Sequence, residues 1–124
     1  MIMEEKNSMS IQQLLEAMTA EMGKSPETMV LLSQVNESAV FEHMANRKFA
    51  MSGTHIPPKY KILMSLAAAA AMGAEKCINN YTQAALRSGI SKEEIVEALL
   101  ITRFVKASTV MSASTDALRM LSEK

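Results

Sequence analysis

Cys77 is the only cysteine of the chain and the side chain best suited to nucleophilic or redox chemistry. Gly73 can end one helix, so a new helix that begins near Ala74 would hold Cys77 in its first turn. The unpaired N–H groups and the positive dipole end of that turn favour an anionic sulfur. Tyr81 lies four residues later on the same helix face, where its phenol can donate a hydrogen bond to the sulfur but keeps its proton near neutral pH. We therefore expect Tyr81 to orient or donate, and not to act as a base.

A second interpretation of these residues remains open. Cys77 stands in a helix with Ile78, Ala84 and Ala85, and free cysteine is among the residue types most often buried as a small apolar side chain. Tyr81 would then be a half-buried tyrosine with no chemical role.

The two histidines, His43 and His55, are the residues suited to proton transfer near neutrality. His43 lies one residue off an apolar helical stripe, and His55 lies in a proline-containing loop that would have to fold back to reach Cys77. Two histidines and one cysteine at this spacing match no zinc-site pattern, so we expect no metal and no cofactor.

The elements that position these residues are predicted to be helices. Apolar residues recur at three-or-four spacing and no stretch alternates in the manner of a strand, which predicts an all-α single-domain bundle of about six to seven helices over residues 1–124. The stretch from Pro58 to Gly73 is apolar nearly all round and is expected to be central and buried. Whether residues 107–121 continue the preceding helix, or follow a bend near Lys106 to Thr109, stays open. The remaining helix limits are predicted from local signals. A cap at Ser10 and an end at Gly23 bound the first helix, and Ser25 and Pro26 open the second. A cap at Ser38 and an end near Gly53 bound the third, Gly89 ends the helix that contains Cys77, and a capping box from Ser91 to Glu94 opens the next.

Charge and hydropathy exclude several classes of partner. Thirteen basic and thirteen acidic side chains balance, which gives no basic patch for nucleic acid or for an anionic membrane. The most apolar segment, residues 62–72, is too short to span a bilayer, and the N-terminal residues do not form a signal peptide. A single cysteine forms no internal disulfide, so a reducing, cytoplasmic location is expected.

The segment PPKYKILMSLAAAAAMGAEKCINNYTQAALRSGISKEEIVEALL resembles the carboxymuconolactone decarboxylase family, which includes the alkylhydroperoxidase D-like proteins. The resemblance covers roughly residues 53–121. Its most specific parts are the run Cys-Ile-x-x-aromatic-x-x-x-Ala-x-x-x-Gly from Cys77 and the Ser-x-x-Glu-Ile-x-Glu-Ala continuation from Ser91. The resemblance implies an all-helical fold and assembly as a trimer or hexamer.

The resemblance also implies where the family's peroxidase residues would fall. Peroxidase-type members carry two cysteines, a histidine and a glutamate, which correspond here to Ala74, Cys77, Tyr81 and Ile62, so only the second cysteine is kept. Without a second thiol, an oxidised Cys77 cannot be resolved within the chain. A histidine brought from elsewhere, such as His55, would restore a base.

Three functions follow as hypotheses. The first is an alkylhydroperoxidase D-like oxidoreductase with peroxiredoxin-type antioxidant activity, in which Cys77 reacts with a peroxide or disulfide and an external thiol reduces it. The second is a decarboxylase-like enzyme acting on a small organic acid through Tyr81 and nearby cations, for which the candidates are Lys59, Lys61 and Arg87. The third is a catalytically degenerate, oligomeric binding protein.

Overall fold

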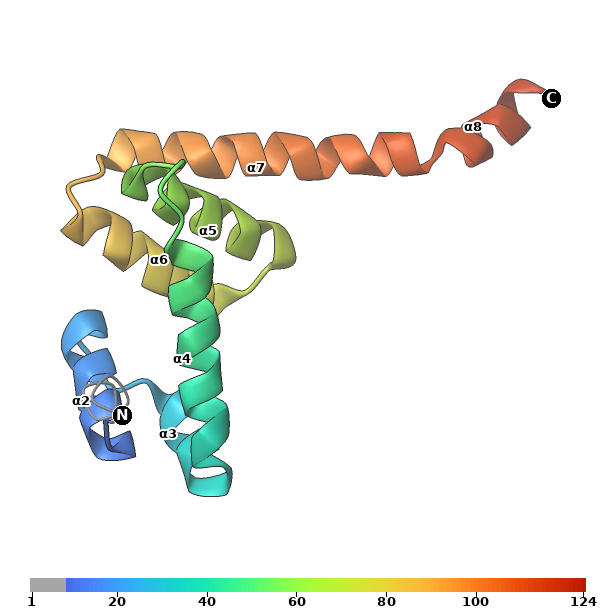
Figure 1. Cartoon of the computed structure of the whole chain (residues 1–124). Helices are drawn as coiled ribbons and strands as arrows, with labels where there is room; N and C mark the ends of the chain where they lie inside the picture. Colours follow the sequence, from blue (N-terminus) through green and yellow to red (C-terminus); the bar gives the residue numbers. More distant parts are fainter. Residues whose placement is uncertain (1–8) are drawn as a thin grey trace. The chain divides into compact units, whose positions relative to one another are not determined.

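The computed structural model describes residues 9–124, which form helices and turns and no strand (Figure 1). The all-α class is therefore confirmed. In the described part of the chain there are seven helices: α2 (Ile11–Met22), α3 (Glu27–Val35), α4 (Glu37–Met51), α5 (Pro58–Met72), α6 (Glu75–Arg87), α7 (Lys92–Ala113) and α8 (Thr115–Ser122).

Contacts within the chain separate two compact units, with the division between His55 and Ile56. Unit 1 contains α2 to α4, and unit 2 contains α5 to α8. That the whole chain is one domain stays a prediction.

In unit 1, the limits of α2 are those predicted from its cap residues. The Ser10 hydroxyl accepts from the Gln13 N–H at 3.1 Å, and the Gln13 side chain accepts from the Ser10 N–H at 3.0 Å, which completes a capping box. Gly23 ends the helix in the left-handed conformation with φ 76°. Met18 of α2 and Val40 of α4 are buried in this unit.

The predicted starts of the next two helices were wrong by one or two residues. Pro26 is the N-cap of α3, so the helix begins one residue later than predicted. Asn36, and not Ser38, caps α4: its extended backbone ends α3, and its side-chain oxygen accepts from the Ala39 N–H at 3.2 Å. One short polar residue thus both ends α3 and accepts a hydrogen bond from an N–H of the first turn of α4.

In unit 2, α5 and α6 form a helical hairpin with a two-residue connection. Gly73 has φ 68°, a left-handed backbone that glycine adopts without a Cβ penalty, and the Ala74 N–H returns to the Ala69 carbonyl at 3.0 Å. At the other end of α6, Gly89 repeats this device with φ 81°, as predicted. Ser91 and Glu94 then form the predicted capping box of α7, with hydrogen bonds of 3.1 Å in both directions.

The core of unit 2 is small. Four buried side chains pack together in it and are here called the core cluster: Leu66, Ala85, Ile90 and Ile95, contributed by α5, α6, α7 and the α6–α7 connection. Five partly buried side chains pack against it: Ile62, Leu63, Ile78, Tyr81 and Leu99.

Two expectations about these helices are settled by the structure. α5 is central in its contacts with α6 and α7, but it is not wholly buried, because only Leu66 and Ala69 are buried on it while Met64 and Met72 are exposed. α7 runs without interruption to Ala113, so there is no bend between Lys106 and Thr109.

Candidate functional site

Cys77 is the third residue of α6 and is exposed, so the thiol lies in a first helical turn as predicted and is not enclosed in a core. The N-cap residue, Ala74, offers no side-chain hydrogen bond to this turn, and its carbonyl accepts the first helical bond from the Ile78 N–H at 2.9 Å. The unpaired N–H groups of this turn lie at the positive end of the helix. Glu75 and Lys76 in the same turn carry opposite charges.

Tyr81 lies one turn further along α6 and is half-buried. The Tyr81 side chain packs against the core cluster and is partly buried by this contact. The position of its hydroxyl relative to the sulfur follows only from the four-residue spacing, so the donor role of Tyr81 stays a prediction.

Ile62 and Tyr81, the positions that resemble the family's glutamate and histidine, pack against the same core cluster. The hairpin therefore brings the two positions to one region of unit 2, although they are 19 residues apart in sequence. That region is filled by an aliphatic side chain and a phenol ring, in place of a carboxylate and an imidazole. Both side chains thus take part in the packing of this unit.

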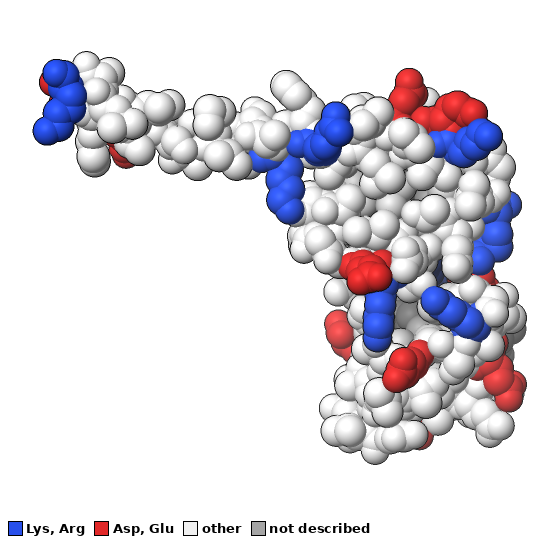
Figure 2. Space-filling view, turned by 180° about the vertical axis from the view of Figure 1, so that it is seen from behind, with Lys and Arg blue, Asp and Glu red and all other residues white. Residues whose placement is uncertain are grey.

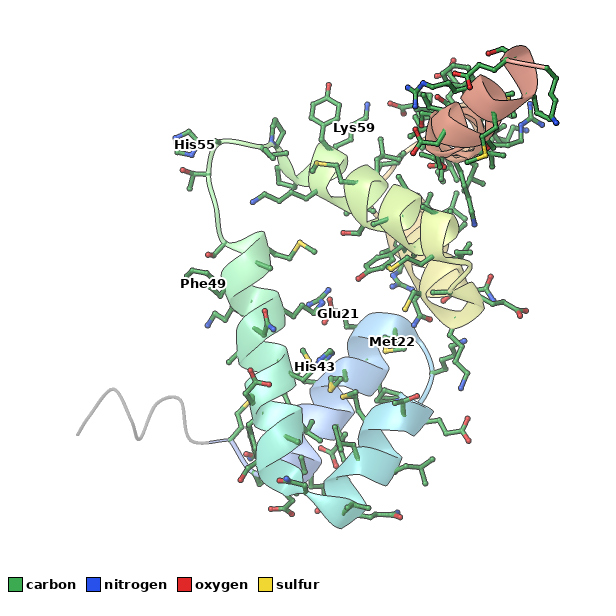
Figure 3. The ribbon with its side chains drawn as sticks, turned by 90° about the vertical axis from the view of Figure 1, so that its right-hand side faces the viewer. Glu21, Met22, His43, Phe49, His55 and Lys59 are labelled. Carbon is green, nitrogen blue, oxygen red and sulfur yellow. The ribbon has the colours of Figure 1, made fainter. Side chains whose placement is uncertain are left out.

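The two histidines lie in unit 1. His55, the last residue of that unit, is exposed and projects away from the ribbon (Figure 3). His43 is exposed on α4, the helix from which Arg47 reaches Glu21 of α2 at 3.4 Å. A role of His55 as a base for Cys77, which belongs to unit 2, stays a prediction.

Lys59 of α5 forms an ion pair with Glu94 of α7. The hydrogen bond with Glu94, together with its charge, raises the pKa of Lys59 above its ordinary value. The hydrogen bond from Lys59 and the Ser91 N–H lower the pKa of Glu94. Glu94 thus closes the capping box with one oxygen and binds the ammonium with the other. The sequence indicated the capping box but not this pair, because its members are 35 residues apart.

The predicted cations do not gather around Cys77. Lys59 and Lys61 are in the first turns of α5 and Arg87 is the last residue of α6, so these residues lie toward the end of the hairpin opposite its Gly73 connection. Cys77 is near that connection. Arg87 lies ten positions after Cys77 on α6, about 15 Å along the helix at 1.5 Å per residue.

An open hollow of about 440 Å³ lies in unit 1, on α2 and α3 and their connection. Its walls are mostly apolar, and none of the predicted catalytic or cationic residues lines it. The residues around it are Ile11, Gln12, Leu15, Glu16, Thr19, Ser25 and Val30.

Two features are absent from residues 9–124. No three His, Cys, Asp or Glu side chains in that range come together in a way that would hold a metal ion. None of the helices in the same range has both the length and the apolar character needed to cross a bilayer.

The amino-acid sequence matches one known protein family. The sequence model described as the carboxymuconolactone decarboxylase family matches residues 38–120, which extends the resemblance seen in the sequence back through most of α4. Among curated proteins, none matches the chain.

Proposed function

The chain belongs to the carboxymuconolactone decarboxylase family, and we propose that it acts as an alkylhydroperoxidase D-like oxidoreductase through the single thiol of Cys77. One observation carries the proposal: the family-position cysteine is exposed in the first turn of α6. A reactive thiol needs access to its substrate, and this position offers that access.

The first step is the reduction of a hydroperoxide, ROOH. The Cys77 thiolate attacks the terminal oxygen, the O–O bond breaks, and the leaving RO⁻ takes a proton to become ROH. The sulfur is oxidised to a sulfenic acid, Cys–SOH. Tyr81 is the proposed hydrogen-bond donor during this step, and His55 the proposed base that removes the thiol proton.

The second step regenerates the thiol with an external reductant, because the chain has no second cysteine. One reductant thiol, R′SH, attacks the sulfenic sulfur and releases water, which leaves a mixed disulfide at Cys77. A second R′SH attacks the R′ sulfur of that disulfide, so that R′SSR′ leaves and the Cys77 thiol is restored. The sum is ROOH and two R′SH giving ROH, water and R′SSR′. Cytoplasmic location and assembly as a homotrimer or homohexamer belong to the same proposal.

The test is steady-state turnover of an organic hydroperoxide with dithiothreitol as the reductant. Cys77→Ser is expected to reduce the rate to that of the buffer. Met72→Leu is the matched control, because Met72 is an exposed sulfur on the same hairpin whose oxidation would consume peroxide only once per chain. Turnover that survives in Cys77→Ser, or a wild-type rate equal to that of the buffer, contradicts the proposal.

A second candidate is a binding or structural protein that has lost its chemistry. The packing of Ile62 and Tyr81 against the core cluster favours it, because both relay positions now stabilise the fold. The rate of Cys77 alkylation at pH 7 separates the candidates: the redox proposal expects a faster reaction than that of free cysteine, and a degenerate scaffold does not. The decarboxylase alternative has less support, since its candidate cations lie toward the other end of the hairpin from Cys77.

A further inference from the structure

The open hollow on α2 and α3 of unit 1 takes no part in the chemistry proposed for Cys77. Its volume of about 440 Å³ lies within the range of small-molecule sites, about 300–1,000 Å³. Three partly buried aliphatic side chains, Ile11, Leu15 and Val30, form its apolar wall. Ile11 and Leu15 are one turn apart on the face of α2 that also carries the buried Met18, so the wall adjoins the core of this unit.

The polar side chains at the hollow present mainly hydrogen-bond acceptors. The Thr19 hydroxyl donates its proton to the Leu15 carbonyl at 2.8 Å, which leaves its oxygen to accept. The Gln12 side chain donates to one oxygen of the Glu16 carboxylate at 3.4 Å, and within residues 9–124 the other Glu16 oxygen accepts no hydrogen bond. The Ser25 hydroxyl can donate or accept. A ligand that supplies donors therefore fits these groups better than one that supplies acceptors.

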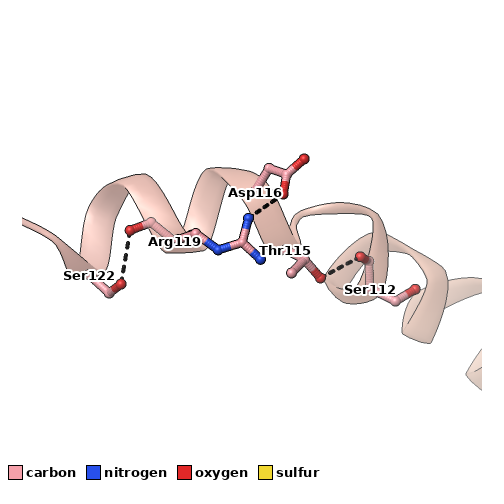
Figure 4. A network of polar contacts seen from close by, with 5 residues as sticks. All are labelled: Ser112, Thr115, Asp116, Arg119 and Ser122. Carbon is pink, nitrogen blue, oxygen red and sulfur yellow. Dashed lines mark hydrogen bonds and ion pairs between the residues drawn. The ribbon is translucent and has the colours of Figure 1, made fainter.

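Glu16 is charged, and it has no cationic partner within residues 9–124. Other carboxylates of the chain do have one: Glu21, on the same helix, pairs with Arg47 at 3.4 Å, and Asp116 pairs with Arg119 at 2.6 Å (Figure 4). Acidic and basic side chains are interspersed over the face of the molecule shown in Figure 2, so the charge of a ligand is selected by the side chains that it touches. The hollow thus combines an apolar wall with an uncompensated negative charge.

From these features we propose that the hollow binds a small apolar molecule that carries a primary ammonium group. The apolar body lies against Ile11, Leu15 and Val30, and the ammonium group binds the Glu16 carboxylate. An ammonium group supplies three donors and a positive charge, which match this carboxylate and the acceptor atoms beside it. A carboxylate ligand meets Glu16 with the same sign of charge and is disfavoured. The site goes beyond the proposed peroxidase activity, which needs only Cys77 of unit 2.

The test uses methyl NMR spectra of the full-length chain, labelled at its isoleucine, leucine and valine methyl groups. Phenethylamine is the probe, and phenethyl alcohol is the matched neutral probe, because a hydroxyl replaces the amine on the same apolar body. At neutral pH the amine is expected to shift the methyl signals of Ile11, Leu15 and Val30 until they saturate, and to leave those of Leu66 and Ile95 in the core cluster in place. The alcohol is expected to bind about fivefold more weakly, which is the effect of one exposed ion pair.

Glu16→Gln removes the charge and keeps the size of the side chain. It is expected to weaken binding of the amine about fivefold and to leave binding of the alcohol unchanged. Glu42→Gln is the matched control, because Glu42 is an exposed carboxylate of the same unit that does not line the hollow. The control is expected to keep the wild-type affinity for both probes. Both positions are exposed, so both variants are expected to keep the wild-type circular dichroism spectrum.

Equal affinity for the amine and the alcohol overturns the proposal, and so does amine binding that is unchanged in Glu16→Gln, because the hollow then does not select a cation. The absence of a saturable shift at Ile11, Leu15 and Val30 also overturns it, including the case in which another part of the chain or a second copy covers the hollow. Cys77→Ser is expected to bind the amine as the wild type does, so failure of the peroxidase proposal leaves this result readable.

Discussion

The two halves of α7 have the same apolar content and different surroundings. Residues 92–102 and 103–113 each contain six apolar residues out of eleven. In the first half, Ile95 is buried and Leu99 packs against the core cluster; in the second half, Phe104, Val105, Val110 and Met111 are all more than half exposed. Composition therefore does not decide burial. What decides it is whether α5 and α6 lie alongside, and the hairpin reaches only the first half (Figure 1).

Leu66→Ala is expected to have the largest effect on stability, because Leu66 is fully buried at the centre of the core cluster. The lost contacts and the residual cavity should lower the free energy of unfolding by about 2–5 kcal/mol. Urea denaturation monitored by circular dichroism measures this. Met64→Ala on the same helix is the exposed control and should change stability by less than about 0.5 kcal/mol in the monomer.

Gly73→Ala should have the next largest effect. The added methyl group meets no atom within 4 Å, so the cost comes from the left-handed backbone alone, about 1–2 kcal/mol. Ser114, which joins α7 to α8, has φ −94° and needs no glycine. Ser114→Ala should therefore lie within about 0.5 kcal/mol of wild type in the same denaturation experiment. Equal effects at the two connections would show that Gly73 is not required by its conformation.

Ser91→Ala removes the N-cap of α7 and should cost about 1 kcal/mol in thermal or urea unfolding. The comparison is Ser108→Ala in the exposed second half of the helix, where alanine is the better helix former and a neutral or slightly stabilising effect is expected. A larger loss from Ser108→Ala would indicate that the second half of α7 packs against another surface.

Glu94→Gln should have the smallest effect, and one that depends on pH. Glutamine can keep the capping box, so the variant removes chiefly the charge paired with Lys59. Because the pKa of Glu94 is lowered in the folded chain, its stabilising contribution is complete above its unfolded pKa and is lost as the pH falls through the lowered value. The wild type should exceed Glu94→Gln in melting temperature at pH 7, and the difference should close below about pH 4.

The ionisation of Lys59 determines at what high pH the ion pair stops stabilising the fold. The pKa of Lys59 is raised above 10.5 in the folded chain. The stabilisation from its charge is therefore complete at neutral pH and is lost only as the pH rises through this raised pKa. A melting-temperature difference that stays constant from pH 3 to pH 7 would mean that the ion pair does not contribute.

Local signals in the sequence predicted much of the fold. The caps at Ser10 and Ser91 and the left-handed glycines Gly23, Gly73 and Gly89 were assigned from residue type and spacing alone, because caps and turns are satisfied within a few residues. The exceptions are equally local: Asn36 took the capping role expected of Ser38 because its position ends the preceding helix.

The candidate site was predictable only in part. That Cys77 falls in a first helical turn followed from Gly73, four residues before it, and its exposure did not, because Ile78, Ala84 and Ala85 of the same helix also fit a buried cysteine. The ion pair of Lys59 with Glu94, and the packing of Ile62 and Tyr81 against one cluster, join residues from different helices.

The sequence by itself thus determined the helical class, most helix ends and the first-turn position of the thiol, since each depends on residues less than one helix apart. It also carries the family pattern, which spans residues 38–120. Only the tertiary structure decided which apolar residues are covered. Burial depends on the length over which helices lie side by side, and here the α5–α6 hairpin covers the start of α7 and leaves Phe104 and Met111 exposed.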